Sequence, residues 1–381
     1  MQFLCQKALI LHRILNFSAM KTGKRGKIVA GLLLVIIIIK LYVLKTERVE
    51  TGYSMQFFKH FSTILRSITG IFPFSIGDVL YAAFVLWLLF QLFKTVRFLV
   101  SSANKGLKRN YTKTILYHWL VWGASLYIVF NLFWGINYNR IGIASQMGLK
   151  KITYSAGELK LLNQMLLVKV NSSKQAWMQT GLAYPPDKAL FGQAADAYDS
   201  LQKTYPFLNY KPASLKTSMW GWFGNYASFT GYYNPFTGEA QVNTTVPKFL
   251  QPFTSCHEIA HQLGYAKEME ANFVGYLVAK SSKKPLFEYS VYLDLFLYAN
   301  RNLYETDSTL AKSFRSQLSV SVKEDLKEGV KFNKNHKGFF EPMITWAYGK
   351  FLENNEQPQG ILSYDAVTGF LIAYYRKFGD I

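Results

Sequence analysis

Two histidines and a glutamate in the C-terminal half of the chain have the spacing that metal-dependent hydrolysis needs. His257 and His261 are four positions apart, so on a helix both imidazoles lie on one face, close enough to bind one zinc ion. Glu258 directly follows the first histidine, where its carboxylate can accept the proton of a water molecule that zinc activates. A helix over residues 249–263 would carry all three, and Gly264 would let it end there. The pattern predicts a catalytic zinc site with Glu258 as the general base.

A catalytic zinc ion also needs a third protein ligand, and the sequence leaves two candidates open. In the longer motif HExxHxxGxxH this ligand is a histidine, but the corresponding residue here is Lys267, which cannot ligate while protonated. Glu268 and Glu270 follow, and they would point about 200° apart on a helix, so only one of them can face the metal. Glu268 is favoured because, with Asn272 four residues later, it resembles the ExxxD pattern of glutamate-ligand zincins, in which the later residue supports a histidine ligand from behind. His336, the only other histidine after residue 140, is the next candidate.

The same ligands would also suit a zinc ion that stabilises a membrane scaffold or sensor without turnover. Such a site has no need for Glu258 between its histidines, so we favour hydrolysis, with a peptide or protein as the substrate. Cys256 adjoins the motif and is interpreted as a small buried apolar residue. The only other cysteine is Cys5, which excludes a disulfide framework and a multi-cysteine metal cluster.

The basic charge of the chain is concentrated in its N-terminal part. The net charge is +20, and residues 1–140 carry 18 Lys and Arg against 3 Asp and Glu, a net of +15. Residues 141–381 carry 25 against 20, a net of only +5. The excess therefore lies beside apolar segments, where basic residues orient membrane proteins. Because there is no zinc finger and no basic motif interleaved with aromatic residues, we expect no nucleic-acid partner.

Three apolar runs are long enough to span a lipid bilayer, and they lie at about 28–44, 73–93 and 115–134. Six Lys and Arg and no acid precede the first run, and the link 94–114 has the same balance. The positive-inside rule places both basic segments in the cytoplasm, so everything after the third run is expected outside it. Met20 would make a plausible alternative start of the chain.

The link between the first two runs has apolar residues at helical spacing. A helix there would be amphipathic, and it would either lie on the bilayer or pack on the protein's own surface; the sequence favours neither. The apolar positions are Phe57, Phe58, Phe61, Leu65, Ile68 and Phe72.

The composition divides the chain into a membrane region, 1–140, and a domain outside the membrane, 141–381. Residues 156–204 have a helical apolar stripe, residues 215–247 are rich in Gly, Tyr, Phe and Thr and predict short strands and turns, and helices return from about residue 249. The predicted fold class is α+β, with an N-terminal three-helix transmembrane region followed by a helix-rich domain with a small sheet.

The segment 231–243, GYYNPFTGEAQVN, leads toward the metal helix. In zincin-like folds the edge strand above the metal-binding helix pairs with an extended substrate, and residues 239–246 could form that strand here. Tyr232 or Tyr233 could donate its hydroxyl to the developing oxyanion, although packing in the core or at a membrane-facing surface would explain either tyrosine as well. Glu239, an acid in an uncharged stretch, would orient a substrate amine or form a salt bridge.

Five segments, in order along the chain, resemble a family of uncharacterised bacterial inner-membrane proteins with a predicted zinc-metalloprotease domain. They are IFPFSIGD (71–78), FWGINYNR (133–140), GYYNPFTGEAQVN (231–243), HEIAHQLGYAKEMEANFVGYL (257–277) and FLENNEQPQGILSYDAVTGFLIAYY (351–375). The resemblance implies a multi-pass protein of the bacterial inner membrane whose extracytoplasmic domain is zincin-like, with a gluzincin-like zinc site. It implies no known substrate.

Overall fold

The computed structural model describes residues 22–150, 152–338 and 341–381, which form two compact units. The N-terminal unit comprises the described residues up to Lys45 together with Val79–Phe133, and the C-terminal unit comprises Thr46–Asp78 and Trp134–Ile381. This division differs from the predicted boundary after residue 140, because two segments of the predicted membrane region belong to the C-terminal unit. Cys5 and Met20 lie outside the described residues.

Three helices are long and apolar enough to cross a membrane: α2 (Thr22–Val43), α5 (Ile76–Val100) and α6 (Lys108–Phe133). Few of their side chains are buried within the protein, as is usual for helices that face lipid. The three predicted apolar runs are therefore confirmed as helices of spanning length. The second and third helices reach further into the basic link than predicted, because long basic side chains can extend from a helix end to the aqueous surface.

The C-terminal unit begins with a short helix, α3 (Thr46–Arg48), the π-helix η1 (Val49–Phe58) and α4 (Lys59–Thr69). After the candidate spans it is built from helices of different lengths around one sheet. The shorter helices are η3 (Gly135–Asn139), α7 (Ile143–Gln146), η4 (Pro206–Leu208), α10 (Gly221–Ala227) and η5 (Gly360–Tyr364). The longer ones are α8 (Ala156–Gln179), α9 (Asp187–Leu201), α11 (Gln251–Gln262), α12 (Glu268–Ser281), α13 (Pro285–Thr306), α14 (Ser308–Ser316), α15 (Val320–Asn335), α16 (Glu341–Asn354) and α17 (Val367–Phe378).

The helix predicted over residues 156–204 is confirmed as α8 and α9, separated by a break at the two prolines of the link. Its apolar stripe is fully buried, and α8 starts with a capping box in which Ser155 accepts from the Glu158 N–H while the Glu158 carboxylate accepts from the Ser155 N–H. The stripe packs in the main core of the unit, together with α11, α12 and α13.

The small sheet lies where the sequence predicted it, but residues 239–246 do not form its edge. Its strands are β1 (Leu215–Thr217), β2 (Gly231–Asn234) and β3 (Glu239–Val242), in the order β1-β3-β2. Because β3 pairs in parallel with β1 and antiparallel with β2, both of its edges are occupied. The prediction that residues 239–246 form the edge strand is therefore wrong, and β2 lies at the edge instead.

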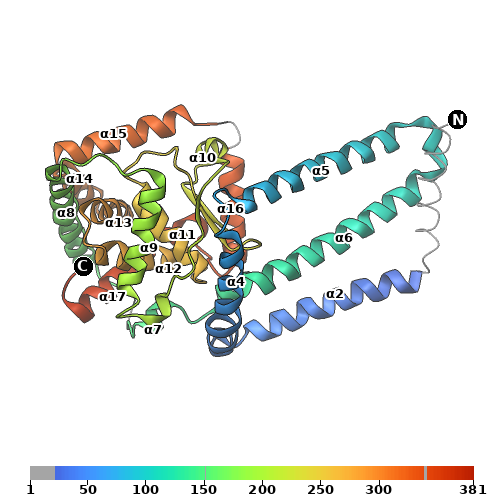
Figure 1. Cartoon of the computed structure of the whole chain (residues 1–381), viewed down its shortest axis with the longest axis horizontal. Coiled ribbons are helices and arrows are strands. Elements are labelled where there is room, and N and C mark those ends of the chain that lie inside the picture. Colours follow the sequence, from blue (N-terminus) through green and yellow to red (C-terminus); the bar gives the residue numbers. More distant parts are fainter. Residues whose placement is uncertain (1–21, 151, 339–340) are drawn as a thin grey trace. The chain divides into compact units, whose positions relative to one another are not determined.

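The helix predicted to carry His257, Glu258 and His261 is confirmed as α11, and it is buried along its whole length. One side packs on β2 and β3, and the others on α12, α13 and α9. In the view of Figure 1, α11 and α12 lie in the interior of the C-terminal unit, between α15 and α17. A helix in this position presents its polar side chains to an enclosed site rather than to bulk water.

Candidate metal centre

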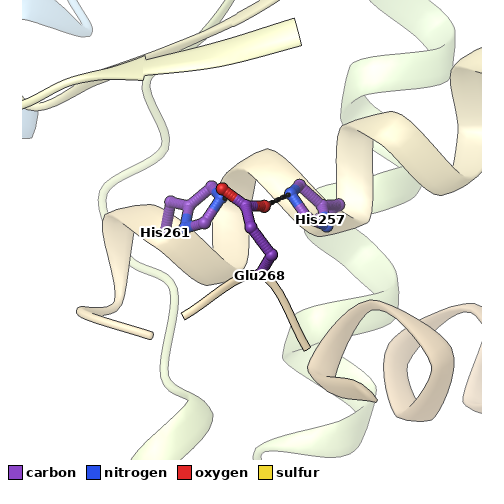
Figure 2. Close-up of side chains that lie close together, drawn as sticks. All are labelled: His257, His261 and Glu268. Carbon is purple, nitrogen blue, oxygen red and sulfur yellow. Dashed lines mark ion pairs between the residues drawn. The ribbon is translucent and has the colours of Figure 1, made fainter. Parts of the chain in front are cut away.

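Three side chains converge at the end of α11 nearest to the start of α12. Nε2 of His257 lies 3.3 Å from Oε2 of Glu268, and Nε2 of His261 lies 3.5 Å from the same oxygen. Figure 2 shows the carboxylate of Glu268 reaching back to the two imidazoles. All three donor atoms lie within 4.8 Å of one another, and all three residues are buried. Metal–ligand bonds of about 2.1 Å in a tetrahedral site place the donor atoms about 3.4 Å apart, so the two nitrogen–oxygen distances are of the size that such a site needs.

The local sequence explains why Glu268 reaches the histidines. Gly264 has a positive φ of 85°, which ends α11 and turns the chain, so α12 begins beside the second histidine with Glu268 as its first residue. Gly275 then allows α12 to approach α11 closely, since a Cβ there would lie 2.9 Å from the Phe253 ring and 3.3 Å from the backbone nitrogen of His257. The two helices therefore hold the ligand groups between them.

Both histidines are oriented by a hydrogen bond on the ring nitrogen that faces away from the cluster. Nδ1 of His257 lies 2.8 Å from Oδ1 of Asn272, and Nδ1 of His261 lies 2.7 Å from the carbonyl oxygen of Tyr265. The Asn272 amide in turn donates to the carbonyl of Tyr364. If both Nδ1 atoms carry the proton, each Nε2 is left as a lone-pair donor directed at the cluster. The structure thus places Asn272 behind a histidine, as its spacing from Glu268 suggested.

Glu258 is buried next to the cluster rather than within it. A Cβ on Gly231 would lie 2.6 Å from Oε1 of Glu258, so the glycine at the start of β2 makes room for this carboxylate. Oε2 of Glu258 has no hydrogen-bond partner among the described residues. Burial raises the pKa of Glu258 to about 7, although the two neighbouring histidines oppose the shift. A carboxylate with this pKa can both accept and return a proton near neutral pH.

The structure separates the two candidate third ligands. The carboxylate of Glu270 faces Gly142, where an added Cβ would lie 1.8 Å from Oε1. Burial raises the pKa of Glu270, although Lys267 and Arg140 oppose this. Among the described residues, only Glu268 joins the two histidines.

His336 is also placed away from the cluster. Its ring contacts Tyr226 and Phe332, and its Nδ1 lies 2.9 Å from the carbonyl oxygen of Phe332. A histidine in these contacts caps the end of α15, and it is not among the residues grouped with His257.

Of the three residues of segment 231–243 that were candidates for contact with the substrate, Tyr232 and Glu239 make structural hydrogen bonds instead. Tyr232 donates its hydroxyl to Asp78 and also contacts the Ser218 hydroxyl, which directs it away from the cluster. Glu239 is fully buried and accepts hydrogen bonds from the N–H groups of Ile76 and Gly77. It therefore caps the N-terminus of α5. Neither of the two predicted roles, orienting a substrate amine or forming a salt bridge, is this one, because the partners of Glu239 come from a segment far away in the sequence.

Tyr233 lies closer to the metal helix. Its ring is 5.3 Å from that of Trp134, which is in turn 5.9 Å from the ring of His261. The ring of Trp134 therefore lies between Tyr233 and His261 of the cluster.

Residues near the C-terminus complete the surroundings of the cluster, and the sequence alone did not identify them. Tyr348 donates its hydroxyl to Oε1 of Glu268 at 2.8 Å, and the Glu268 N–H donates to Oε1 of Gln357. The ring of Tyr364 stacks on His257 at 6.3 Å, and its hydroxyl lies 3.3 Å from that of Tyr348. Burial and the nearby Glu268 charge raise the pKa of both tyrosines well above the usual value, so they remain hydroxyl donors. The only sequence signal was their presence in the resembling segment 351–375 or just before it.

The carbonyl groups at the end of α11 are satisfied by side chains from outside the helix. Trp134 donates to the carbonyl of His261, Arg66 to that of Gln262, and Arg140 to that of Gly264. Arg140 is buried and forms an ion pair of 2.6 Å with Glu50. Cationic groups at a helix C-terminus offset the helix dipole, and here they also fix the loop that carries the Tyr265 carbonyl.

The charges of the cluster depend on one another in the metal-free protein. Burial alone would lower the pKa of His261, but the Glu268 carboxylate outweighs it and raises this pKa to about 9. Burial would likewise raise the pKa of Glu268, but His261 and His257 lower it well below its usual value. The carboxylate is thus held in its ionised form, and zinc would take the place of a proton on His261.

The structure defines a helix-rich protein with three helices of membrane-spanning length and a buried cluster of two histidines and one glutamate. The chain belongs to a family described as "Protein of unknown function (DUF3810)", whose model matches residues 53–372. No curated protein and no solved structure shows significant similarity to the chain.

Proposed function

We propose that the protein is a membrane-anchored zinc hydrolase with a zincin-like domain, and that it cleaves peptide bonds. The observation that carries the proposal is the convergence of His257, His261 and Glu268 at the donor spacing of a tetrahedral zinc site, with Glu258 buried beside it. The donor set consists of two imidazoles and one carboxylate, which suits a catalytic site that keeps one position for water or substrate.

Zinc in this site would act as a Lewis acid, polarising a carbonyl group and lowering the pKa of a water molecule. Glu258 accepts the proton of the attacking water and transfers it to the amine that leaves. Asn272 and the Tyr265 carbonyl keep the two imidazoles in the orientation that ligation needs. Tyr348 is within reach of the same space through its contact with Glu268, which makes it a better candidate for stabilising the oxyanion than Tyr232.

The position of β2 supports a polypeptide as the substrate. This strand lies at the edge of the sheet, and its first residue, Gly231, contacts Glu258. An extended peptide that pairs with the outer edge of β2 would run past the general base, with main-chain hydrogen bonds that do not depend on its sequence.

The alternative is a zinc-stabilised scaffold or sensor without turnover, and Glu258→Gln separates the two. The variant keeps the three ligands and the buried volume, so it should retain zinc and the folded state. If the protein is a hydrolase, peptides that accumulate outside wild-type cells should be lost in cells that carry the variant. A variant that fully supports the cellular role of the protein would favour the scaffold.

We also propose that the C-terminal unit lies outside the cytoplasm of a bacterial inner membrane. The proposal rests on the basic, acid-free composition of link 94–114 between α5 and α6. A reporter that is active only outside the cytoplasm should be active when fused after Arg140 and silent when fused near Lys105. The opposite pattern would place the metal centre in the cytoplasm.

A further inference from the structure

The helix α4 has its polar side turned inward. Ser62, Arg66 and Thr69 are 2%, 2% and 5% exposed. Arg66 donates to the carbonyls of Pro212 and Gln262, and the Thr69 hydroxyl lies 2.9 Å from that of Ser214. The inner side of α4 is therefore fixed to the rest of the C-terminal unit by hydrogen bonds of its polar side chains.

The opposite side of α4 exposes two large apolar side chains, next to the polar residues His60 and Ser67. Ile64 is 58% exposed and Ile68 is 55% exposed, and the segment that follows continues the pattern with Ile71 at 79%. Phe72 and Phe74 in this segment are also exposed. A surface helix of a water-soluble domain has the reverse distribution, with its apolar side buried and its polar side in solvent. The inverted pattern indicates that the outer side of α4 does not face water.

A second exposed apolar group lies at the start of α10. Met219 and Trp222 are 58% and 69% exposed, and Trp220 and Phe223 are exposed as well. The Met219 N–H donates to the carboxylate of Asp78, and the Trp220 indole donates to the Asp78 carbonyl. Asp78 is in the first turn of α5, one of the helices long enough to span a membrane. Both apolar groups therefore adjoin the segment through which the chain enters α5.

We propose that these two groups form one surface that rests in the interface of the lipid bilayer. We call it the docking surface; it comprises Phe57, Ile64, Ile68 and residues 71–74 and 219–223. Isoleucine and phenylalanine would enter the acyl region, and the tryptophans would lie at the headgroup level, which they prefer. The lipid is the occupant that the structure favours, because α5 leads directly from this surface into a helix of spanning length. The C-terminal unit is then held against the membrane by its own surface as well as by the chain.

Spin labels on full-length protein in vesicles test this placement directly. Single cysteines at Ile64, Ile68 and Trp222 carry the labels, in a Cys5→Ser background; Cys256 is fully buried and can remain. The vesicles contain phosphatidylcholine and phosphatidylglycerol, and the relaxation of each label by oxygen is compared with its relaxation by a water-soluble nickel complex. Oxygen concentrates in the acyl region, whereas the nickel complex stays in water. Labels at Ile64 and Ile68 should therefore respond more to oxygen, and the label at Trp222, at the headgroup level, should have a ratio of oxygen to nickel response between theirs and that of a label in water.

Two equally exposed apolar positions on other helices of the C-terminal unit serve as matched controls. Val168 on α8 and Val330 on α15 are 65% and 64% exposed, and labels there should respond more to the nickel complex. The proposal is overturned if the labels at Ile64, Ile68 and Trp222 behave like these controls. It is also overturned if they are shielded from both reagents, since that would indicate a protein partner or a second copy of the chain. The measurement needs neither zinc nor turnover, so its outcome is independent of the proposed activity.

Discussion

The choice between Glu268 and Glu270 gives the sharpest test of the metal centre. Glu268→Gln replaces one of three protein donors with a neutral amide of the same size. Loss of a group that merely supports a ligand weakens metal binding about 10- to 100-fold, so loss of the ligand itself should exceed about 100-fold, or about 2.7 kcal/mol. Glu270→Gln changes a side chain that faces Gly142, and burial already favours its neutral form, so zinc affinity should change less than about threefold.

The assay is a competition between full-length protein and a zinc chelator, with thermal unfolding of each metal-free variant as a control for folding. X-ray absorption of the zinc form adds a direct check, because it should find nitrogen and oxygen neighbours at about 2.0–2.1 Å and no sulfur. Equal and small effects of the two substitutions would refute the assignment, as would a larger effect of Glu270→Gln. A sulfur neighbour would do the same, since it would make Cys256 a ligand.

Two further changes test the general base and the charge of the cluster. Gly231→Ala would bring a Cβ to 2.6 Å from Glu258 Oε1, against an ordinary contact of 3.4 Å or more, and a displacement of this size should lower kcat about 10- to 100-fold while zinc is retained. Gly329→Ala is the control: its Cβ would lie 3.8 Å from its nearest neighbour, so kcat and zinc content should not change. Both variants are compared by peptide hydrolysis and zinc content. Equal rates for the two variants would contradict the role of Gly231. Zinc binding near neutral pH should release about one proton, because the raised pKa of His261 keeps its imidazole protonated until zinc displaces the proton. Calorimetry in buffers of different ionisation enthalpy should show this release declining as the pH rises through about 9, and a release that does not depend on pH would contradict it.

The parts of the site that depend on helical periodicity could be predicted from the sequence. The spacing of His257 and His261 fixes their common face on any helix, and the position of Asn272 four residues after Glu268 depends on the same periodicity. The choice of Glu268 over Glu270 depends instead on how α12 packs on α11, which the close approach at Gly275 decides. Periodicity alone could show only that one of the two glutamates faces the metal.

The features that the sequence missed all come from contacts between distant segments. Tyr348 and Tyr364 reach the cluster from about 80 to 100 residues further along the chain, and nothing local marks them. The composition of residues 215–247 predicted a small sheet. The order β1-β3-β2 depends on the parallel pairing of β1 with β3, which composition does not show, so β3 was predicted to lie at the edge. Glu239 was assigned to substrate or a salt bridge because its partners, two backbone N–H groups of α5, are not visible in a sequence.

The capping of α11 has a consequence for how the protein is made. Arg66 and Gln262 are 196 residues apart in the chain, and Arg140 and Gly264 are 124 apart. The earliest of these groups leaves the ribosome before α5 and α6 are synthesised, and its partner follows only after both. The C-terminal unit therefore cannot form these contacts until the chain through Gly264 has been synthesised. Contacts between residues far apart in the sequence slow folding. A fragment that starts at residue 141 would lack Arg66, Trp134 and Arg140. The carbonyl groups at the C-terminal end of α11 would then have lost these hydrogen-bond donors.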